Sequence, residues 1–393
     1  MILTDDQYEG LYKLEKWYWK HTHQIIEISG VIGTGVEQLI NYFIERSNLD
    51  IKEIMFLSYD QKQVLEMAAK RYHAYYINSI IYKYFREVDF NTLPVINQHS
   101  KQIEYKWKKE VRKKIDPRYK LIVVFDSMLL NEKTLADLGS FGLPIILIKD
   151  PMLFPAPDSF TYTRDPNIVL REIHPELYKN PIIYFANKIL RGEKIQFGNY
   201  DNVSIIHRKE MNLYNLKSPN MVLTLSDEMR NQVNKIYRSR ILKQRSIINV
   251  PGERLICMSN MYAHKLVNSN EKKVKVFLTK GIVGKITKCN KHVVSTKYLP
   301  IVFQPEFYYD QFDDLTIDRH YLNKIDVPSR QIIPDEVAYF DYAYALTPQM
   351  ARINHWDKVT LIVDRDELDD ENIMKYKLYT AITRARRQMT III

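Results

Sequence analysis

Short apolar runs that alternate with helical patterns are the feature that most constrains the fold of this chain. In the first half these runs are Ile25–Ser29, Ile54–Ser58, Leu121–Phe125 and Pro144–Ile148, each rich in branched side chains. Such runs are typical of strands that are buried on both faces of a parallel sheet. Helical patterns such as Val36–Arg46 lie between them. Strands alternating with helices predict a doubly wound α/β sheet, whose ligands bind at the carboxyl ends of the strands.

A second α/β pattern follows the first. It begins near Pro175 and ends with the runs Val359–Asp364 and Met389–Ile393. Each of the two patterns is interrupted by one segment. The polar segment 85–120 interrupts the first pattern. The segment 273–334 reads as short strands with polar turns, so we expect a small β-barrel inserted into the second pattern.

The charge of the chain favours a polyanionic partner. The sequence of 393 residues has 57 Lys plus Arg against 47 Asp plus Glu, which gives a net charge of +10. Fixed positive charge attracts phosphate. The segment 101–120 contains nine basic and three acidic residues. It is either a solvated surface or an insertion that contacts phosphates, and the candidate contacts are Lys108, Lys109, Lys113 and Lys114.

Several classes of protein are not supported by the sequence. The two cysteines, Cys257 and Cys289, lie far apart, and no CxxC or Cys/His spacing predicts a disulfide framework or a structural zinc site. The N-terminal residues do not resemble a signal peptide. No apolar run reaches the ~20 residues that span a bilayer. We therefore expect a cytoplasmic protein without a membrane contact, and the abundance of Lys, Ile and Asn suits an AT-rich genome such as that of a phage.

A glycine-rich turn follows the first predicted strand. The stretch 25–37 reads IIEISGVIGTGVE. A working phosphate-binding loop is GxxxxGK[ST], in which the Lys contacts the β- and γ-phosphates and the hydroxyl contacts magnesium. Here the Lys position is Val36 and the Ser/Thr position is Glu37, while the glycines are Gly30, Gly33 and Gly35. Taken alone, such a turn is more often a tight connection than a nucleotide site.

The role of Glu37 has two interpretations. A carboxylate in the first turn of a helix is favoured by the helix dipole and by the unpaired N–H groups there. Glu37 could thus fill the anion site of the loop itself. The alternative is a side chain that points into solvent.

Further landmarks recur in a fixed order along almost the whole chain. They are Leu3-Thr4-Asp5-Asp6-Gln7, Tyr76-Ile77-Asn78-Ser79, Leu121–Glu132, Ser140-Phe141-Gly142, Lys149-Asp150-Pro151, Glu172-Ile173-His174-Pro175, the set Arg230, Asn234 and Arg238, Gly252-Glu253-Arg254, Tyr344-Ala345-Leu346-Thr347 and Tyr379-Thr380-Ala381-Ile382-Thr383-Arg384-Ala385. Their order and spacing resemble those of RecD-like and Dda-like superfamily 1 DNA helicases.

The resemblance implies an α/β fold with two RecA-like P-loop-NTPase-type domains. The first would span 1–174, with a pin-like insertion at about 85–120. The second would span 175–393, with an SH3-like β-barrel insertion at about 273–334. In the family, single-stranded DNA runs across both domains.

The departures from the family concentrate where ATP would be hydrolysed. Motif II of the family carries Asp-Glu, but here it aligns with Phe125-Asp126, or with Asp126-Ser127 after a shift of one. One carboxylate remains where the metal and the water each need one. The Gln of motif III is Leu153, the Arg of motif IV is Pro175, and motif V is replaced by Gln349–Asn354. We therefore expect no catalytic residue, no bound cofactor and no metal.

Two positions that contact ATP in the family remain, Gln7 and Arg384. By resemblance, Gln7 belongs to a motif that recognises adenine. Arg384 could keep a phosphate contact, but we favour pairing with a nearby acid such as Asp126.

These features lead to a hypothesis with two alternatives. The hypothesis is a catalytically inactive helicase-like protein that binds single-stranded nucleic acid, DNA rather than RNA. It would act as an accessory or scaffold in viral or mobile-element replication, recombination or transcription, together with a protein partner. The first alternative is a protein-interaction module that docks a polymerase or an active helicase without binding DNA. The second is a divergent active helicase.

Overall fold

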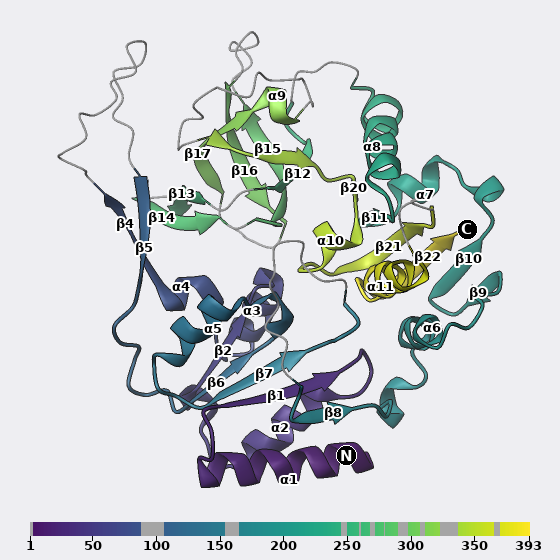
Figure 1. Ribbon diagram of the computed structural model, residues 1–393. Coiled ribbons are helices and arrows are strands. Elements are labelled where there is room, and N and C mark those ends of the chain that lie inside the picture. The colour runs from purple at the N-terminus through teal and green to yellow at the C-terminus, as the bar shows by residue number, and fades with distance from the viewer. Residues whose placement is uncertain are drawn as a thin grey trace. The chain divides into compact units, whose positions relative to one another are not determined.

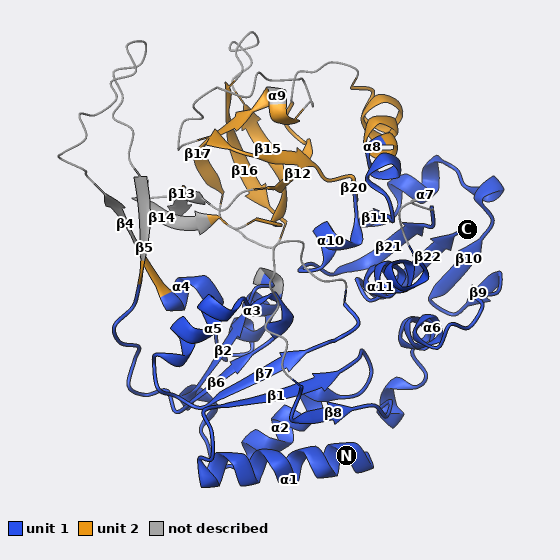
Figure 2. Cartoon of the chain, viewed as in Figure 1, with its two compact units in different colours: residues 1–81, 111–231, 346–393 blue, residues 82–110, 232–345 orange. Residues whose placement is uncertain are grey.

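The computed structural model describes residues 3–87, 106–153, 165–244, 250–258, 261–267, 272–278, 280–289, 298–306, 311–322, 337–364 and 370–393. The chain forms two compact units (Figure 2). The first unit contains residues 1–81, 111–231 and 346–393, and the second contains 82–110 and 232–345.

A parallel sheet forms the first lobe of the first unit (Figure 1). Its described strands, in spatial order, are β3 (His73–Tyr76), β2 (Ile54–Ser58), β6 (Leu121–Val124), β7 (Ile145–Lys149), β1 (Ile25–Gly30) and β8 (Ile168–Leu170). β1 pairs in parallel with β7 on one side and β8 on the other. All residues of β1 after Ile25 are buried, as expected for a central strand between helices.

Helices cover this sheet and prepare the end of β1. They are α1 (Asp5–Lys20), α2 (Val36–Arg46), α3 (Gln61–Ala69), α4 (Ile77–Ile81) and α5 (Glu132–Gly139). Side chains of α1 and α2, including Leu14 and Phe43, join those of the strands in one hydrophobic cluster. α1 starts at a capping box formed by Thr4 and Gln7, which satisfies two N–H groups at the helix start. This cap fixes Gln7 beside the end of β1.

A second, mostly parallel sheet forms the second lobe of the first unit. Its described strands, in spatial order, are β20 (Ala345–Leu346), β11 (Met221–Thr224), β21 (Trp356–Ile362), β22 (Ala385–Ile392), β10 (Val203–Ile206) and β9 (Gly198–Tyr200). The helices of this lobe are α6 (Pro181–Leu190), α7 (Leu213–Lys217), the start of α8 (Asp227–Ile236), α10 (Pro348–Ala351) and α11 (Glu371–Ile382). β22 pairs in parallel with both β21 and β10. The chain therefore ends in the middle of this sheet.

The second unit contains a large, mainly antiparallel sheet. Its described strands are β14 (Lys272–Leu278), β13 (Met261–Val267), β17 (Phe312–Asp318), β16 (Tyr298–Pro305), β15 (Val283–Cys289), β12 (Arg254–Cys257) and β19 (Phe340–Tyr342), with β18 (Val337–Ala338) beside β17. A short helix, α9 (Arg319–Leu322), follows β17. β4 (Tyr82–Glu87) and β5 (Lys106–Val111) form a separate two-stranded sheet. The large sheet has its own hydrophobic cluster, in which Phe303 and Phe340 are fully buried.

The side-chain amide of Asn234 links the two ends of the stretch 232–345 in the second unit. Asn234, near the end of α8, is buried, and its nitrogen donates to the carbonyls of Tyr342 and Ala345. Its oxygen accepts the N–H groups of Tyr344 and Ala345, at 3.0 and 2.8 Å. The segment that enters this unit is thus tied to the segment that leaves it.

The expected α/β class is confirmed by the two sheets of the first unit. The described sheet of the second unit extends from Arg254 to Tyr342, beyond the 273–334 assigned to the barrel. Both parallel sheets belong to one compact unit. The division into two domains at 174/175 stays a prediction. Part of the expected pin, 88–105, lies outside the described residues. None of the helices within the described ranges combines the length and the apolar character that crossing a bilayer requires.

Candidate functional site

The conformation of the turn after β1 depends on its glycines. Gly33 and Gly35 have φ angles of 93° and 72°, in the left-handed region that favours glycine. A Cβ atom on Gly30 would lie 2.5 Å from Thr34 Oγ1 and 2.7 Å from Val36 Cγ2, which is too close for any side chain. The glycines are therefore required by the turn itself, whether or not a ligand binds.

Gln7 is bound to this loop by its own amide. Its nitrogen donates to the carbonyl oxygens of Thr34 and Gly35, at 3.1 and 3.0 Å. Its oxygen accepts the N–H of Thr4 at 3.0 Å, and the residue is fully buried. Because an amide nitrogen has two protons, both donors are used by the loop. Gln7 thus fixes the backbone of the loop at Thr34 and Gly35.

The two substituted positions of the loop have different surroundings. Val36 is partly buried and packs against the hydrophobic cluster of the first lobe. Glu37 is exposed in the first turn of α2. The acid that the structure places at the loop backbone is a different one, Asp150, which follows β7.

Tyr379 and Asp150 join the two lobes at the glycine loop. The Tyr379 hydroxyl accepts the N–H of Ile32 at 2.8 Å and donates to Asp150 Oδ2. The Ile32 N–H also interacts with the Asp150 carboxylate, and Oδ1 of Asp150 accepts the N–H of Met152 at 2.9 Å. Burial raises the pKa of Asp150 to about 6, despite these hydrogen bonds. A loop N–H that could face a phosphate is therefore engaged by the protein's own oxygen atoms.

Asp126 lies in an acidic environment. It follows β6 with a φ of 51°, between the buried residues Phe125 and Ser127. Its pKa is raised to about 6, first by burial and then by the charges of Asp60, Asp150 and Glu37, although Arg384 lowers it. Its sequence neighbours Phe125 and Ser127 are uncharged, so the turn itself supplies one carboxylate.

Arg384 is buried and donates to uncharged oxygen atoms. Its Nε donates to the carbonyl of Thr380 at 3.2 Å, and Nη2 donates to Thr383 Oγ1 at 3.1 Å. Nη1 donates to the carbonyl of Arg352. Burial lowers the pKa of Arg384, and Asp126, Asp60 and Asp150 oppose this effect through their charges. The interaction with Asp126 is thus electrostatic, and no ion pair between the two appears among the described contacts.

Other polar contacts connect the same two lobes. His355 Nδ1 lies 3.3 Å from Asp60 Oδ2, and burial lowers the pKa of His355 to about 4. Arg386 makes a two-pronged ion pair with Glu66, at 2.5 and 3.1 Å. In addition, the Asn187 amide donates to the Ile32 carbonyl at 3.4 Å. The two lobes are thus connected at several points by hydrogen bonds and an ion pair.

The structure describes the side chains of two of the four lysines assigned to nucleic acid. Lys113 and Lys114 are exposed after the end of β5. Lys108 and Lys109 belong to β5, but their side chains lie outside the described residues.

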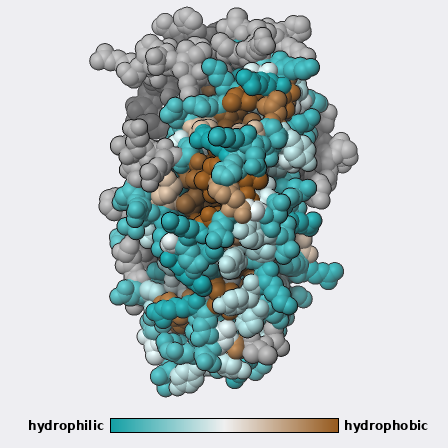
Figure 3. All heavy atoms as spheres, turned by 90° about the vertical axis from the view of Figure 1, so that its right-hand side faces the viewer, coloured by the Kyte–Doolittle hydropathy of each residue, from teal (hydrophilic) through white to brown (hydrophobic). Residues whose placement is uncertain are grey.

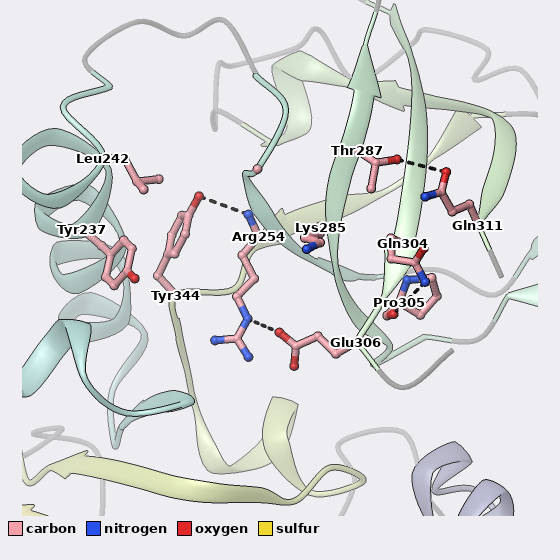
Figure 4. A pocket seen from close by; sticks show the side chains of 11 residues that line it. Tyr237, Leu242, Arg254, Lys285, Thr287, Gln304, Pro305, Glu306, Gln311 and Tyr344 are labelled. Atoms are coloured by element: carbon pink, nitrogen blue, oxygen red, sulfur yellow. Dashed lines mark hydrogen bonds and ion pairs between the residues drawn. The ribbon is translucent and has the colours of Figure 1, made fainter. Parts of the chain in front are cut away.

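The second unit contains a pocket of about 670 Å³, shown in Figure 4. One wall carries Tyr237 and Leu242, from the π-helical turn 237–241 and the residue after it, together with Tyr344. Arg254, Lys285 and Gln304 are register partners on β12, β15 and β16, so their side chains lie in a row on one face of the sheet. Thr287, Pro305, Glu306, Gln311 and Gly252 complete the lining.

Buried contacts hold the aromatic wall of this pocket. The rings of Tyr237 and Tyr344 stack at 4.4 Å with an angle of 12°. The Tyr344 hydroxyl accepts the N–H of Arg254 at 3.1 Å. Arg238, one residue after Tyr237, pairs at 2.7 Å with the fully buried Glu253. These contacts hold the turn 237–241 next to Arg254 and Tyr344.

Sequence reasoning did not identify these arrangements. Asp150 and Tyr379 were landmarks of the resemblance but not expected site residues. The pocket was not expected at all, although Arg238 and the stretch Gly252-Glu253-Arg254 were noted and now prove to form its supports. Among the described residues, no group of His, Cys, Asp and Glu is arranged to hold a metal ion.

No family model and no curated protein matches the sequence. Solved structures that are similar to the chain include those of Pif1 helicases. A study of DNA unwinding at forked DNA by two coordinating Pif1 helicases provides one, with a TM-score of 0.47, 11% identity and coverage of 100% of this chain and 92% of that chain. Pif1 from Candida albicans has a TM-score of 0.39 and 13% identity, over 99% and 94%. The helicase of PRRSV has a TM-score of 0.36 and 12% identity, over 97% and 54%. The resemblance of this chain to superfamily 1 helicases rests on its ordered motifs.

Proposed function

We propose that this protein binds single-stranded nucleic acid, DNA in particular, through a helicase-like fold that does not hydrolyse ATP. It acts as an accessory or scaffold that stays on the strand instead of moving along it. Viral or mobile-element replication, recombination or transcription is the setting that this role suits.

The engagement of the glycine loop is the observation that carries the inactive part of the proposal. Gln7 holds the carbonyls of Thr34 and Gly35, while Tyr379 and Asp150 hold the N–H of Ile32. A phosphate at the Ile32 N–H would have to displace Tyr379 and Asp150, without the lysine that Val36 replaces. It would also meet carboxylates, and a unit charge about 4 Å from a phosphate oxygen repels it by roughly 4 kcal/mol at an effective dielectric constant near 20.

Positive charge supports the nucleic-acid part of the proposal. The chain has a net charge of +10, and Arg112, Lys113 and Lys114 form an exposed basic run. Contacts between such residues and phosphates provide affinity that does not depend on base sequence. We therefore expect weak, salt-dependent binding of any single strand.

Two measurements test the two parts separately. DNA-stimulated phosphate release is expected to stay far below ~1 s⁻¹, the low end of ordinary enzyme turnover. A rate at or above this value would overturn the inactive part.

For binding, the affinity for a labelled oligonucleotide is measured against salt concentration. Changing Lys108, Lys109, Lys113 and Lys114 together to Gln should lower the slope by about 3 units, because each phosphate contact on a single strand contributes roughly 0.7. The matched control changes four exposed lysines from elsewhere in the chain to Gln, namely Lys16, Lys20, Lys209 and Lys217. Equal slopes in the two variants would remove the basic run from the binding surface.

A second candidate function, docking of a protein partner, is favoured by exposed apolar side chains. Figure 3 shows hydrophobic atoms gathered in patches among hydrophilic ones on one face. In the second lobe Tyr178, Tyr184, Phe197, Leu213 and Tyr214 are each more than two-fifths exposed. If the wild-type protein binds no oligonucleotide, and purification from its host recovers a polymerase or helicase only when Phe197 and Leu213 are retained, this candidate replaces the first.

A further inference from the structure

The pocket of the second unit has the chemistry of a base-binding site, and this inference rests on the proposed binding of single-stranded nucleic acid. Its aromatic wall is formed by the partly exposed ring of Tyr237, which stacks on the buried ring of Tyr344, and both residues line the pocket (Figure 4). The Tyr344 ring is itself fixed by the hydrogen bond to Arg254 N–H. Such a rigid flat face suits a flat ligand, and bases stack on aromatic side chains regardless of their identity.

Opposite this wall, the pocket offers hydrogen-bonding groups from the sheet. Thr287, Gln304 and Gln311 contribute a hydroxyl and two amides, as Figure 4 shows. Thr287 Oγ1 donates to Gln311 Oε1 at 3.4 Å, which links two of these groups. Gln304 Nε2 donates to the carbonyl of Pro305 at 3.3 Å. An amide carries two donor protons and an acceptor oxygen, so the two glutamines can exchange these weak contacts for the edge of a base. Polar groups of this kind do not require one particular base.

The charge of the pocket selects a strand over a free nucleotide. Arg254 is paired with Glu306 at 2.5 Å, so Lys285, which is exposed, supplies the remaining positive charge. One net positive charge matches one phosphodiester group. A nucleoside triphosphate carries several negative charges, and sites for it use a lysine together with magnesium and loop N–H groups.

We propose that this pocket binds one base of a single-stranded nucleic acid, stacked on Tyr237, with the adjoining phosphate at Lys285. The volume of about 670 Å³ accommodates a nucleotide together with water. The site lies entirely within the second unit and is separate from the glycine loop. It gives the strand a fixed point that needs no nucleotide cofactor.

The experiment compares two neighbouring lysines on one strand. Lys285 and Lys288 are both exposed on β15, but only Lys285 lines the pocket. Binding of an oligonucleotide that contains one 2-aminopurine is followed by fluorescence, since stacking quenches this base. We expect Lys285→Gln to weaken binding about 3- to 10-fold at low salt and to lower the salt slope by roughly 0.7. Lys288→Gln should change the affinity less than about 2-fold.

Substitutions of Tyr237 test the stacking. Tyr237→Phe should keep both affinity and quenching, whereas Tyr237→Leu should weaken binding by about 5- to 100-fold and abolish the quenching. If Tyr237→Leu does not fold, as judged by its melting curve, the two lysine variants decide the question alone.

Each outcome has one meaning. A wild-type protein that binds no oligonucleotide overturns the proposed function. Suppose that the wild-type protein binds the oligonucleotide, that Lys285→Gln and Lys288→Gln weaken binding equally, and that Tyr237→Leu has no effect. This result would overturn the proposed base-binding pocket but not the proposed function. Full displacement of the strand by an equal concentration of free ATP would also overturn the proposed pocket, because the site would then recognise a mononucleotide.

Discussion

The glycine loop of the first unit and the pocket of the second unit differ in how their polar groups are used. At the loop, hydrogen-bonding groups are consumed by other parts of the chain, as with the Gln7 amide and the Ile32 N–H. In the pocket, polar groups also have partners, as Thr287 has Gln311 and Arg254 has Glu306, but they line an open volume of about 670 Å³. Within one chain, the groups of one site can thus be engaged by the protein itself while another site keeps an open volume. The position of glycines alone does not tell which sites remain usable.

The largest effect that would sharpen this comparison concerns Gln7. Gln7→Ala removes the two donors that hold Thr34 and Gly35 and leaves buried carbonyls unsatisfied, so we expect a loss of about 2–4 kcal/mol in the free energy of unfolding. The matched control is Gln24→Ala. Gln24 also donates to two carbonyls, those of Gly139 and Leu143, but it is exposed, so its loss should cost less than about 1 kcal/mol. Equal values in urea denaturation would show that the loop does not depend on Gln7.

The contact between the lobes should have the next largest effect. Tyr379→Phe removes the hydroxyl between Ile32 and Asp150, and we expect a loss of about 1–3 kcal/mol together with faster hydrogen exchange at the Ile32 amide. Tyr376→Phe, on the same helix and partly exposed, serves as the control. Unchanged exchange at Ile32 in Tyr379→Phe would contradict the closure of the loop by the second lobe.

The raised pKa of Asp126 predicts a pH dependence whose sign can be worked out. The pKa is about 6 in the folded protein and ordinarily 3.8, so between pH ~4 and ~6 the folded state retains a proton that the unfolded state has lost. The free energy of unfolding therefore falls as pH rises through this window. His355 acts in the opposite direction, because its pKa is lowered from 6.5 to about 4.

Asp126→Asn isolates the first effect. We expect this variant to be more stable than the wild type by about 1–3 kcal/mol at pH 7, with the difference shrinking toward pH 4. Denaturation curves at several pH values give this difference directly. A variant less stable than the wild type at pH 7 would mean that the carboxylate has a favourable partner.

The smallest expected effect would test how far the loop can return to nucleotide binding. Val36→Lys combined with Glu37→Thr restores the charge and the hydroxyl of the phosphate-binding pattern. We expect weak binding of Mg-ADP and a rise of a few degrees in melting temperature when ligand is added. Hydrolysis of ATP should still be absent, because Asp126 has no second carboxylate beside it in motif II. The control, Val36→Met with Glu37→Gln, should not respond to the nucleotide. Tight binding of Mg-ADP by the wild-type protein would show that the engaged groups of the glycine loop do not prevent nucleotide binding.

Local patterns predicted the first lobe well. The helix Val36–Arg46 has the predicted ends, and the strands Ile25–Gly30 and Ile54–Ser58 agree within one residue, because their apolar periodicity reports burial directly. The second unit was predicted less well. Its sheet begins at Arg254, outside the expected barrel, since antiparallel strands take partners that sequence periodicity does not specify.

At the candidate site too, local features could be predicted from the sequence and long-range contacts could not. The glycine turn was visible because its spacing is local. The contact between Asp150 and Tyr379 joins residues 229 positions apart, and no local pattern indicates it. Gln7 was recognised as a landmark, yet its partners depend on how α1 lies against the end of β1. The stacked pair Tyr237 and Tyr344 likewise exists only after the second unit has folded.

The clamp formed by Asn234 has a consequence for how the chain folds and diversifies. Since one amide ties the entering helix to the leaving strand, the first unit meets the stretch 232–345 as a short connection, whatever its actual length. Closing a long loop lowers the conformational entropy of the chain. Here this loss opposes folding of the second unit and does not oppose assembly of the parallel sheets. Insertions and deletions beyond the clamp should therefore leave the first unit folded. This part of the chain can change over evolutionary time, or be exchanged by an engineer, at little risk to the rest.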